Sequence, residues 1–570
     1  LNLDGYLTIE EVLGAKLTKT CDSLCPLTND VLDGVKAPTT PAEEKAEEEA
    51  PAEEAAPAAP VATAATVAGG TLKIHIGEGK DINLEIPVGA LGATGEAVAE
   101  VPAAVAATAT AEAPVEEAKV VGTLTRRHIK ITEVKRGPET KIEGTTLYIR
   151  EGIEAEVIAD QELVKDFHLE IITPDKYHTY SETIMDVQPV ATKEGDAILG
   201  EGATRVLDGV VMMLTGTDEG GVQIGEFGSS EGYLDENIMW GRPGCPDKGE
   251  IFIKGNIVVQ EKTNMERRGP MAAHTAFDII TQEIREVMKE LDDSFIVEDE
   301  ELKSIRRPGK KKVVIVKEIM GQGAMHDNFI LPVEPVGILG ARANVDLGNV
   351  PVCVSPLEVL DGCIHALTCI GPASKEMSRH YWREPLVLEA LHDEEVDLCG
   401  VVFVGSPQIN AEKYYVSRRV GHTVEMMDVD GAFVTTEGFG NNHIDFASHI
   451  EQIGMRGIPV VGLSFCAVQG ALVVGNKYMQ YMVDNNKSES GIENEVLGCN
   501  TLCQEEGIRA LAMLKAAMAG EEVKTAEKKW NPNVKSTNVE LIEAACGKKI
   551  ELVDNEQSLP MSQKRKEKYD

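Results

Sequence analysis

Apolar and polar residues alternate along this chain with a period that changes from one region to the next. Between residues 119 and 262, stretches such as LTRRHIKITEVKRG, TTLYIREG and DFHLEIITP alternate apolar and polar positions, and glycine turns separate many of them. A period of two residues is typical of half-buried strands. This region is therefore predicted to be a β-rich domain.

The pattern is different between residues 263 and 525, where β-branched apolar runs alternate with helical periodicity. Strands are predicted at 311–320, 396–405 and 457–465, and helices at 269–291, 443–457 and 503–520. Strands that are apolar on both faces and alternate with helices imply right-handed crossovers and a largely parallel sheet. The fold class is therefore predicted to be α/β, with a β-rich domain followed by a mostly parallel α/β domain and a C-terminal extension at 526–570.

The first 118 residues are predicted to form small units joined by linkers. Residues 1–36 are expected to be helical up to Lys19 and contain a Cys-x3-Cys pair. Residues 37–70 and 92–118 are rich in Ala, Pro, Glu and Thr, which is typical of disordered acidic linkers. Between them, residues 71–91 alternate around a Gly-Glu-Gly-Lys turn, which predicts a small β-hairpin module.

Composition narrows the class of protein and its surroundings. The chain has 570 residues, enough for several domains, and its formal net charge of −39 argues against a nucleic-acid or anionic-membrane partner, although part of that charge lies in the linkers. Eleven cysteines are too sparse for a disulfide scaffold, and no signal peptide or apolar run of 18 or more residues is visible. We therefore expect a cytoplasmic protein without membrane insertion.

A glycine-containing turn at 320–329, MGQGAMHDNF, follows a predicted strand and invites comparison with a dinucleotide-binding loop. The third glycine of that fingerprint is replaced by Met325 or His326, and no acidic residue closes a recognisable unit. An ordinary tight turn is the better interpretation.

Metal ligands are not clustered at useful spacings in this sequence. Two Cys-x3-Cys pairs occur, but neither has a second pair or a histidine run nearby, so no metal site is predicted. The pairs are Cys21 with Cys25 and Cys499 with Cys503. His443 and His449 lie six residues apart, a spacing that does not place them on one helical face, so surface or capping roles are expected.

Cys369 lies in the stretch HALTCIGPASKE, between Thr368 and an Ile-Gly-Pro sequence that would break a helix. A cysteine in an apolar segment is usually a small hydrophobic residue. A thiol held against the preceding carbonyl offers a specific alternative, because its attack turns the Thr368–Cys369 amide into an ester-like linkage. Elimination from the cysteine then cuts the chain and leaves a dehydroalanine that hydrolyses to a pyruvoyl group. A strained turn suits this chemistry better than a position within a helix.

The block HALTCIGPASKEMSRHYWREPLVLEALHDEEVDLCGVVFVGSPQINAEKYYVSRRVGH, with GNNHIDFASHIEQIGMRGIPVVGLSF downstream, resembles the pyruvoyl-forming proproteins of the D-proline reductase and glycine/sarcosine/betaine reductase family. The resemblance covers residues 119 to 525. The N-terminal Cys-x3-Cys unit and the long acidic linkers favour the D-proline branch.

The resemblance implies a cleavage that makes Cys369 the pyruvoyl precursor and Thr368 the residue before it. The two pieces would have 368 and 202 residues, since cleavage separates residues 1–368 from residues 369–570. Cys363 and Cys353 are nearby alternatives, but Cys363 lacks the preceding Thr and the following Gly-Pro.

The activity that the resemblance implies is reductive opening of D-proline to 5-aminovalerate. The pyruvoyl carbonyl would form a Schiff base with the proline amine, and a selenocysteine from a separate small subunit would displace the nitrogen at Cα. The implied partners are that subunit, an electron-donating thiol or reductase protein, and further copies of the cleaved subunits. Arg379 and Arg383 share a helical face at i and i+4 and are predicted to bind the substrate carboxylate.

Other functions remain open at this stage. The chain fits a substrate subunit of glycine, sarcosine or betaine reductase, or a non-catalytic paralogue that scaffolds a reductase complex. A nicotinamide-dependent oxidoreductase is less well supported, because its glycine fingerprint is incomplete.

Overall fold

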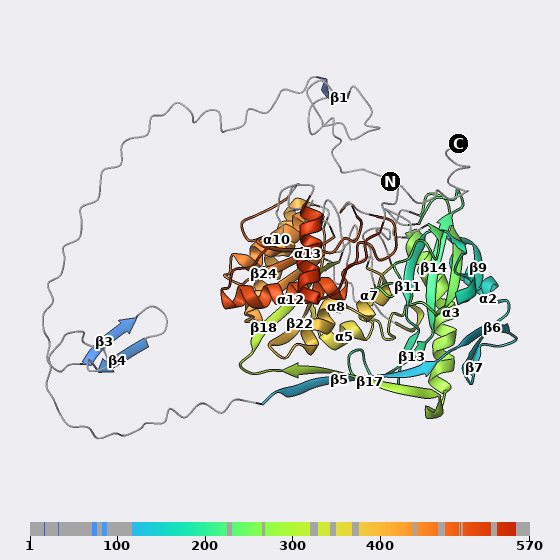
Figure 1. The fold of residues 1–570 in the computed structure, drawn as a ribbon, viewed down its shortest axis with the longest axis horizontal. Coiled ribbons are helices and arrows are strands. Elements are labelled where there is room, and N and C mark those ends of the chain that lie inside the picture. Colours follow the sequence, from blue (N-terminus) through green and yellow to red (C-terminus); the bar gives the residue numbers. More distant parts are fainter. Residues whose placement is uncertain are drawn as a thin grey trace. The chain divides into compact units, whose positions relative to one another are not determined.

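The computed structural model describes residues 117–224, 231–264, 268–319, 329–341, 349–367, 376–407, 409–436, 442–465, 474–489, 491, 494–525 and 533–553, together with four short strands between residues 16 and 87. The chain divides into one unit of residues 1–109 and a second unit of residues 110–570 (Figure 1).

Two antiparallel strand pairs are described in the first unit. They are β1 (Lys16–Leu17) with β2 (Leu32–Asp33), and β3 (Thr71–Ile76) with β4 (Ile82–Pro87). The second pair lies within the segment for which alternation predicted a hairpin. The prediction of a helix up to Lys19 is wrong at Lys16 and Leu17, because these two residues form a strand that pairs with β2. The predicted linkers, and Cys21 and Cys25, lie almost entirely outside the described residues.

The β-rich part of the second unit contains two four-stranded sheets and one three-stranded sheet. The sheet of order β12-β13-β5-β17 consists of β5 (Lys119–Lys130), β12 (Ala191–Lys193), β13 (Gly202–Asp208) and β17 (Ile296–Arg306). The sheet of order β11-β14-β16-β9 consists of β9 (Val164–Ile172), β11 (Ile184–Gln188), β14 (Val210–Asp218) and β16 (Ile251–Val259). The three-stranded sheet consists of β6 (Glu133–Gly137), β7 (Lys141–Glu143) and β8 (Thr146–Arg150).

Helices α2 (Ile153–Asp160) and α3 (Arg268–Glu290) belong to this β-rich part. The apolar side of α3 shares a core with strands β9, β14 and β16, and β17 pairs antiparallel with β5. Both α3 and β17 follow residue 262, so they lie in the part of the sequence that was predicted to be the α/β domain. Periodicity predicted the helix at 269–291, but it carries no information about which core that helix joins, and strand β17 was not predicted.

The α/β part is built on a six-stranded sheet of order β20-β22-β18-β23-β24-β25. Its strands are β18 (Lys311–Ile319), β20 (Val352–Val354), β22 (Val396–Gly405), β23 (Gly431–Thr436), β24 (Val460–Ser464) and β25 (Tyr481–Asp484). The strands pair in parallel except β20, which runs antiparallel to β22 at one edge. The predicted α/β fold class and the largely parallel sheet are confirmed.

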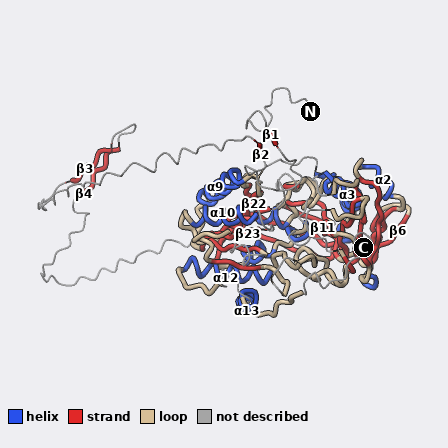
Figure 2. The backbone as a smooth tube through the Cα atoms, turned by 90° about the horizontal axis from the view of Figure 1, so that it is seen from above, coloured by secondary structure: helices blue, strands red, loops and turns tan. Residues whose placement is uncertain are grey.

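Helices cover both faces of this sheet. They are α5 (Pro356–Leu360), α7 (Ser378–Trp382), α8 (Pro385–His392), α9 (Asn410–Met426), α10 (Asn442–Gly454), α12 (Gln504–Ala519) and α13 (Val534–Cys546). Val314 and Val316 of β18 face a core shared with α9 and α10, whereas Val313 and Ile315 face a core shared with α8, α12 and α13. Figure 2 shows these two helix layers on opposite sides of the strands. The predicted extension at 526–570 therefore contributes one helix, α13, to the α/β core.

The strand order places a topological switch point beside β18. The chain passes from β18 to β22 on one side and then to β23 on the other, so the five parallel strands follow the order 2-1-3-4-5. In open α/β sheets of this kind, ligands bind outside the carboxyl ends of the strands where the order reverses. The carboxyl ends of β18 and β23 are therefore expected to carry functional side chains.

Two short strand pairs and three 3-10 turns complete the described elements. They are β10 (Tyr180–Ser181) with β15 (Gly232–Tyr233), β19 (Phe329–Ile330) with β21 (Ile364–His365), and the turns Pro174–Lys176, Asp293–Phe295 and Leu339–Ala341.

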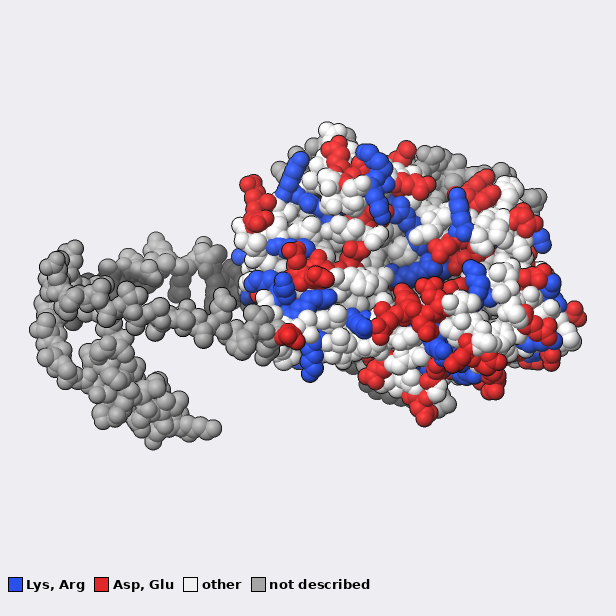
Figure 3. All heavy atoms as spheres, turned by 60° about the horizontal axis from the view of Figure 1, so that its bottom comes forward, with Lys and Arg blue, Asp and Glu red and all other residues white. Residues whose placement is uncertain are grey.

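Acidic and basic side chains are interspersed on the face of the described region shown in Figure 3. A mixed surface of this kind differs from the continuous basic track that binds a nucleic-acid backbone. Among the described helices, none combines the length and the apolar character needed to cross a bilayer.

Candidate functional site

Thr368 and Cys369 lie in the interval 368–375, outside the described residues. The structure does describe what precedes and follows that interval. The backbone N–H of Ala366, just after β21, donates to Ser378 Oγ at the start of α7, with an N···O distance of 2.9 Å. The two ends of the interval are therefore held side by side.

Asp186 on β11 ties these ends to the β-rich part. Its side chain is fully buried, and its carboxylate accepts four hydrogen bonds. Oδ1 accepts from the N–H groups of Val187 and Ser378, both at 2.9 Å, while Oδ2 accepts from Ser378 Oγ at 2.6 Å and Gln188 Nε2 at 2.9 Å. A carboxylate with four donors is a rigid anchor for the start of α7.

Two buried histidines extend this group. His365 Nε2 lies 3.0 Å from Gln188 Nε2 and 3.3 Å from His274 Nδ1, which comes from α3. Ligand atoms of Asp186, His274 and His365 lie within 4.8 Å of one another, close enough to share a metal ion. The Asp186 oxygens already accept protein donors, so the set is arranged for hydrogen bonding rather than for metal ligation.

Glu376, which follows the undescribed interval, contacts two buried side chains, Lys317 and His380. Its Oε2 lies 3.2 Å from Lys317 Nζ and its Oε1 lies 3.3 Å from His380 Nε2. Burial alone would raise the pKa of Glu376, but the charges of His380 and Lys317 outweigh it and lower the pKa to about 2. Glu376 is therefore a carboxylate with little basicity.

Lys317, at the carboxyl end of β18, also contacts Glu384 Oε1, at 2.7 Å. Burial opposes its charge, but Glu376 and Glu384 outweigh burial and raise the pKa of Lys317 above its ordinary value. Lys317 is an ammonium group near neutral pH. Since only a neutral amine attacks a carbonyl, Lys317 is not an amine nucleophile in this arrangement.

Arg379 and Arg383 point to carboxylates of their own chain. Both reach Asp247, at 3.5 and 2.8 Å, and Arg379 also makes a bidentate pair with Glu250 at 2.5 and 2.6 Å. The shared helical face predicted from their spacing is present. The predicted role in binding a substrate carboxylate stays a prediction.

The two alternative cysteines lie in or beside a strand. Cys363 is buried just before β21, and burial together with Glu358 and Asp361 raises the pKa of its thiol well above the usual value. Cys353 is exposed on β20 and pairs with Val402 of β22. Cys353 is held in a paired strand, and the thiol of Cys363 is buried and undissociated. Both are poorer candidates for attack on a backbone carbonyl than a thiol in a turn would be.

A second buried network, which the sequence did not predict, lies at the carboxyl ends of the sheet strands. Lys413 of α9 is paired with Asp445 of α10. Lys413 Nζ donates to Ser406 Oγ, after β22, at 3.0 Å, and Ser406 Oγ donates to Asp445 Oδ2 at 2.7 Å. Glu318 of β18 lies 3.8 Å from His449 Nε2. These residues stand at the topological switch point, where the fold favours function.

His443 and His449, expected at the surface or as caps, are buried. His443 Nε2 lies 3.1 Å from Ser464 Oγ at the end of β24. Burial, with a smaller effect of the Lys413 charge, lowers the pKa of His449 to about 3, so its imidazole is neutral at ordinary pH. The predicted surface positions are wrong. Both histidines lie on α10 and are buried, and a six-residue spacing does not reveal the burial of either one. The turn at 320–328 lies outside the described residues, so the interpretation of MGQGAMHDNF stays a prediction.

Glu318→Gln should remove a pH dependence of stability. Burial and the nearby charge of Asp445 raise the pKa of Glu318 well above 4.5 in the folded chain. The folded state then holds this proton more tightly than the unfolded state. The resulting stabilisation is complete below the unfolded pKa and is lost as the pH rises through the folded pKa, by about 1.4 kcal/mol for each pKa unit of the shift.

Glutamine does not titrate, so the variant should gain free energy of unfolding relative to the unchanged chain as the pH increases from 4 to 8. Urea unfolding at several pH values measures this difference. Glu394→Gln, at an exposed position between α8 and β22, is the control and should show no such trend. A constant difference between Glu318→Gln and the unchanged chain would contradict the prediction.

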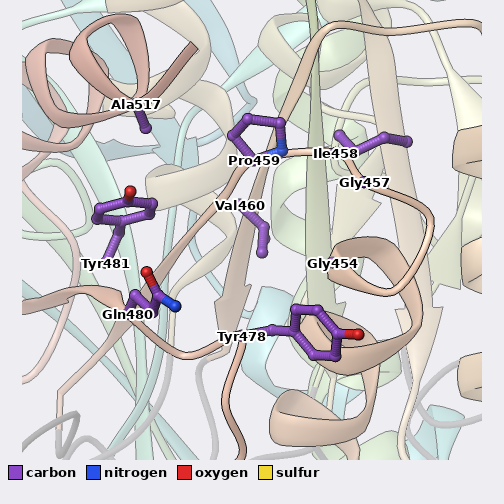
Figure 4. A pocket seen from close by; sticks show the side chains of 9 residues that line it. All are labelled: Gly454, Gly457, Ile458, Pro459, Val460, Tyr478, Gln480, Tyr481 and Ala517. Carbon is purple, nitrogen blue, oxygen red and sulfur yellow. The ribbon is translucent and has the colours of Figure 1, made fainter. Parts of the chain in front are cut away.

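One cavity of about 230 Å³ lies at the amino ends of β24 and β25, opposite the strand ends that carry these networks (Figure 4). It is lined by Gly454, Gly457, Ile458, Pro459, Val460, Tyr478, Gln480, Tyr481 and Ala517. The tyrosine hydroxyls are its titratable groups, so it lacks an acid or a base suited to neutral pH. The buried networks, rather than this cavity, form the candidate site.

Comparisons with known proteins identify the family of this chain. The glycine/sarcosine/betaine reductase component B family matches residues 123–471, which include the interval 368–375 and most of both networks. The chain is 68% identical to the D-proline reductase proprotein PrdA of Acetoanaerobium sticklandii over 99% of this chain and 91% of that protein.

More distant relatives match a smaller share of the chain. The glycine reductase complex component B subunits alpha and beta of the same organism are 24% identical over 59% of this chain and 77% of that protein. The sarcosine reductase complex component B subunit alpha of Peptoclostridium acidaminophilum is 24% identical over 58% of this chain and 77% of that protein. No solved structure matches the chain significantly. The chain belongs to the glycine/sarcosine/betaine reductase component B family.

Proposed function

We propose that this chain is the precursor of a D-proline reductase subunit. The observation that carries the proposal is 68% identity, over nearly the whole chain, to a protein named as a D-proline reductase proprotein. The glycine and sarcosine reductase relatives share much less identity and omit about two fifths of the chain. The proline branch of the family is therefore favoured over the glycine branch.

Processing at the Thr368–Cys369 bond is the second part of the proposal. The Cys369 thiol attacks the Thr368 carbonyl carbon, so the C–N bond is replaced by a C–S bond and the thiol proton passes to the freed amine. Loss of the Cα proton then breaks the Cβ–S bond, and the sulfur leaves as the thiocarboxylate of Thr368, which water converts to the carboxylate and hydrogen sulfide. Water hydrolyses the resulting enamine, through its imine, to the ketone and releases ammonia.

The described residues fit a carbonyl group formed in this interval. Asp186 and Ser378 hold its flanks together, and His274 and His365 supply buried imidazoles able to move protons. When present, a pyruvoyl carbonyl supplies an electrophile that activates the D-proline amine, and the nucleophile that displaces the ring nitrogen comes from the selenocysteine of a partner subunit. Burial of the flanking groups excludes water from the positions they occupy.

An intact-mass measurement on the purified chain tests the processing. Pieces of 368 and 202 residues, the shorter one beginning with a carbonyl-blocked terminus, are expected. A single uncleaved chain in active material would overturn this part of the proposal and favour a scaffold role.

Reconstitution tests the substrate. The processed chain should be inactive with a dithiol alone and should open D-proline once a selenocysteine-containing small subunit is added. Glycine turnover in place of D-proline in that mixture would move the chain to the other branch of the family. Turnover by the processed chain alone would contradict the requirement for a partner nucleophile.

A further inference from the structure

Six buried polar atoms near the carboxyl end of β18 make no hydrogen bond with the described part of the chain. They are both carboxyl oxygens of Glu318, both ring nitrogens of His449, Nδ2 of Asn442 and Oδ1 of Asp445. Asn442 and Thr436 lie near Glu318, but neither completes a hydrogen bond with it. Each of the four side chains is at most 6% exposed. Since folded proteins leave few buried polar atoms unpaired, six in one place indicate a polar ligand.

The fold directs these atoms toward one another. Glu318 lies on the same face of β18 as Val314 and Val316, because alternate residues of a strand point to one side of the sheet. Helices α9 and α10 cover that side. Asp445 and His449 lie four residues apart on α10 and share a face of that helix. Glu318 Oε2 is 3.8 Å from His449 Nε2, which is too long for a hydrogen bond, so strand and helix present unpaired groups to each other.

The charges of this group show what it lacks. Two charged side chains act on Glu318, Asp445 from α10 and Lys413 from α9, and these two are already paired with each other. His449 is neutral at ordinary pH, because its pKa is lowered to about 3. Burial and the charge of Asp445 outweigh Lys413 and raise the pKa of Glu318 well above its ordinary value. The free site therefore keeps Glu318 protonated, and a second cation beside it would let it ionise.

An organic ammonium group fits this need better than a metal ion. A metal requires ligand atoms that converge on one point, and among the described residues the sets whose ligand atoms lie within 4.8 Å of one another do not include Glu318. An ammonium group donates separate N–H bonds in different directions, so it can reach Glu318 and Asp445 Oδ1 together. The unpaired N–H groups of Asn442 need an acceptor as well. A ligand that carries both an ammonium group and a carboxylate, such as an amino acid, satisfies both needs.

We propose that Glu318 and Asp445 bind the ammonium group of the amino-acid substrate, whose identity as D-proline rests on the function proposed above. The N–H groups of the ligand donate to Glu318 and to Asp445 Oδ1, and Asn442 Nδ2 donates to the ligand carboxylate. Glu318 gives up its proton to solvent when the ligand binds. The site lies at the topological switch point, where ligands bind in sheets of this kind. Lys317, the neighbour of Glu318 on β18, holds Glu376 at the end of the processing interval.

Glu318→Gln is the decisive variant. Glutamine has the shape of the protonated carboxyl group, so the free site keeps its packing, but it cannot ionise. Binding of D-proline is measured by titration calorimetry on the full-length Cys369→Ala chain, which has no carbonyl to condense with the amine. Adding Glu318→Gln should raise the Kd about tenfold or more, because a charge-assisted hydrogen bond is lost. Adding Glu394→Gln instead, at an exposed position, should leave the Kd unchanged.

The proton balance gives a second measurement that needs no comparison of stability. While Glu318 is protonated in the free site, each bound ligand should release one proton, and the Kd should fall about tenfold for each unit of rising pH. Calorimetry in buffers of different ionisation enthalpy counts that proton. The Glu318→Gln chain should release none. Proton release that persists in this variant would assign it to Asp445, Lys413 or His449, the other titratable groups facing this site, and would overturn the proposal.

Matched ligands separate recognition of the ammonium group from a structural effect. Tetrahydrofuran-2-carboxylate has an oxygen in place of the proline nitrogen, so it should bind weakly and equally to the chains with and without Glu318→Gln. An equal loss of affinity for both ligands in the variant would overturn the proposal, and so would displacement of D-proline by K⁺ or Na⁺ with release of the same proton.

The site and the proposed function can fail separately. Binding of D-proline that does not depend on Glu318, together with turnover of D-proline by the processed chain and its partner, would overturn the site and leave the function. Turnover of glycine in place of D-proline, together with glycine binding that depends on Glu318, would uphold the ammonium site and overturn the assignment to the proline branch.

Discussion

Cys369→Ala should give a single full-length chain with no reactive carbonyl and no turnover of D-proline. Alanine has no thiol to attack the Thr368 carbonyl and no sulfur to leave from Cβ, so both the acyl shift and the elimination are blocked. The loss of processing should be complete, because no other group replaces the bond that the thiol forms. A denaturing gel measures cleavage, and a hydrazide probe measures the carbonyl.

Two other cysteines provide matched controls. Cys363→Ala removes a buried thiol six residues earlier, and Cys353→Ala removes an exposed thiol on β20. Both variants should still be cleaved into pieces of 368 and 202 residues. Cys369→Ser should be cleaved slowly, because a hydroxyl supports the same rearrangement with a poorer leaving group. Normal cleavage of Cys369→Ala, or loss of cleavage in Cys363→Ala with a folded chain, would show that the processing residue is elsewhere.

In the α/β part, the sequence predicted β18, β22, β24, α10 and α12 closely, but it did not name β20, β23 or β25. The run KKVVIVKEIM contains four successive apolar residues, Val313 to Val316, because β18 is covered on both faces. Strands β22 and β24 and helices α10 and α12 have similarly clear signals, and their bounds differ from the predicted ones by only a few residues. Local periodicity is sufficient where one element has one dominant environment.

The candidate site was predicted only in part, since its contacts join distant positions. Asp186, His274, His365 and Ser378 come from β11, α3, β21 and α7, and no local pattern connects them. HALTCIGPASKE drew attention to Cys369 through its chemistry, and His365 stands at the start of that same stretch. A histidine beside the proposed processing residue was the available signal for the buried network, but its partners required the fold.

Arg379→Met should destabilise the folded chain by about 3–5 kcal/mol, which is the cost of leaving a buried carboxylate without its cation. Arg379 is 4% exposed and holds both oxygens of Glu250, and it also donates to the carbonyl oxygen of Cys245 at 3.2 Å. Methionine fills much of the space but supplies no charge. Urea unfolding should show the loss as a lower midpoint.

Arg383→Met is the control, because its side chain is 32% exposed and pairs with Asp247, itself 39% exposed. An ion pair open to water contributes about 0.2–1 kcal/mol, so this variant should stay close to the unchanged chain. Glu250→Gln combined with Arg379→Met should recover part of the lost stability, since it removes the uncompensated charge.

The alternative role of Arg379 in substrate binding gives the opposite pattern: Arg379→Met would leave the unfolding midpoint unchanged and raise the KM for D-proline. A stable Arg379→Met chain with weakened substrate binding would therefore assign Arg379 to the substrate site. A destabilised chain would show instead that the Arg379 guanidinium group holds α7, and with it the end of the processing interval, against the β-rich part.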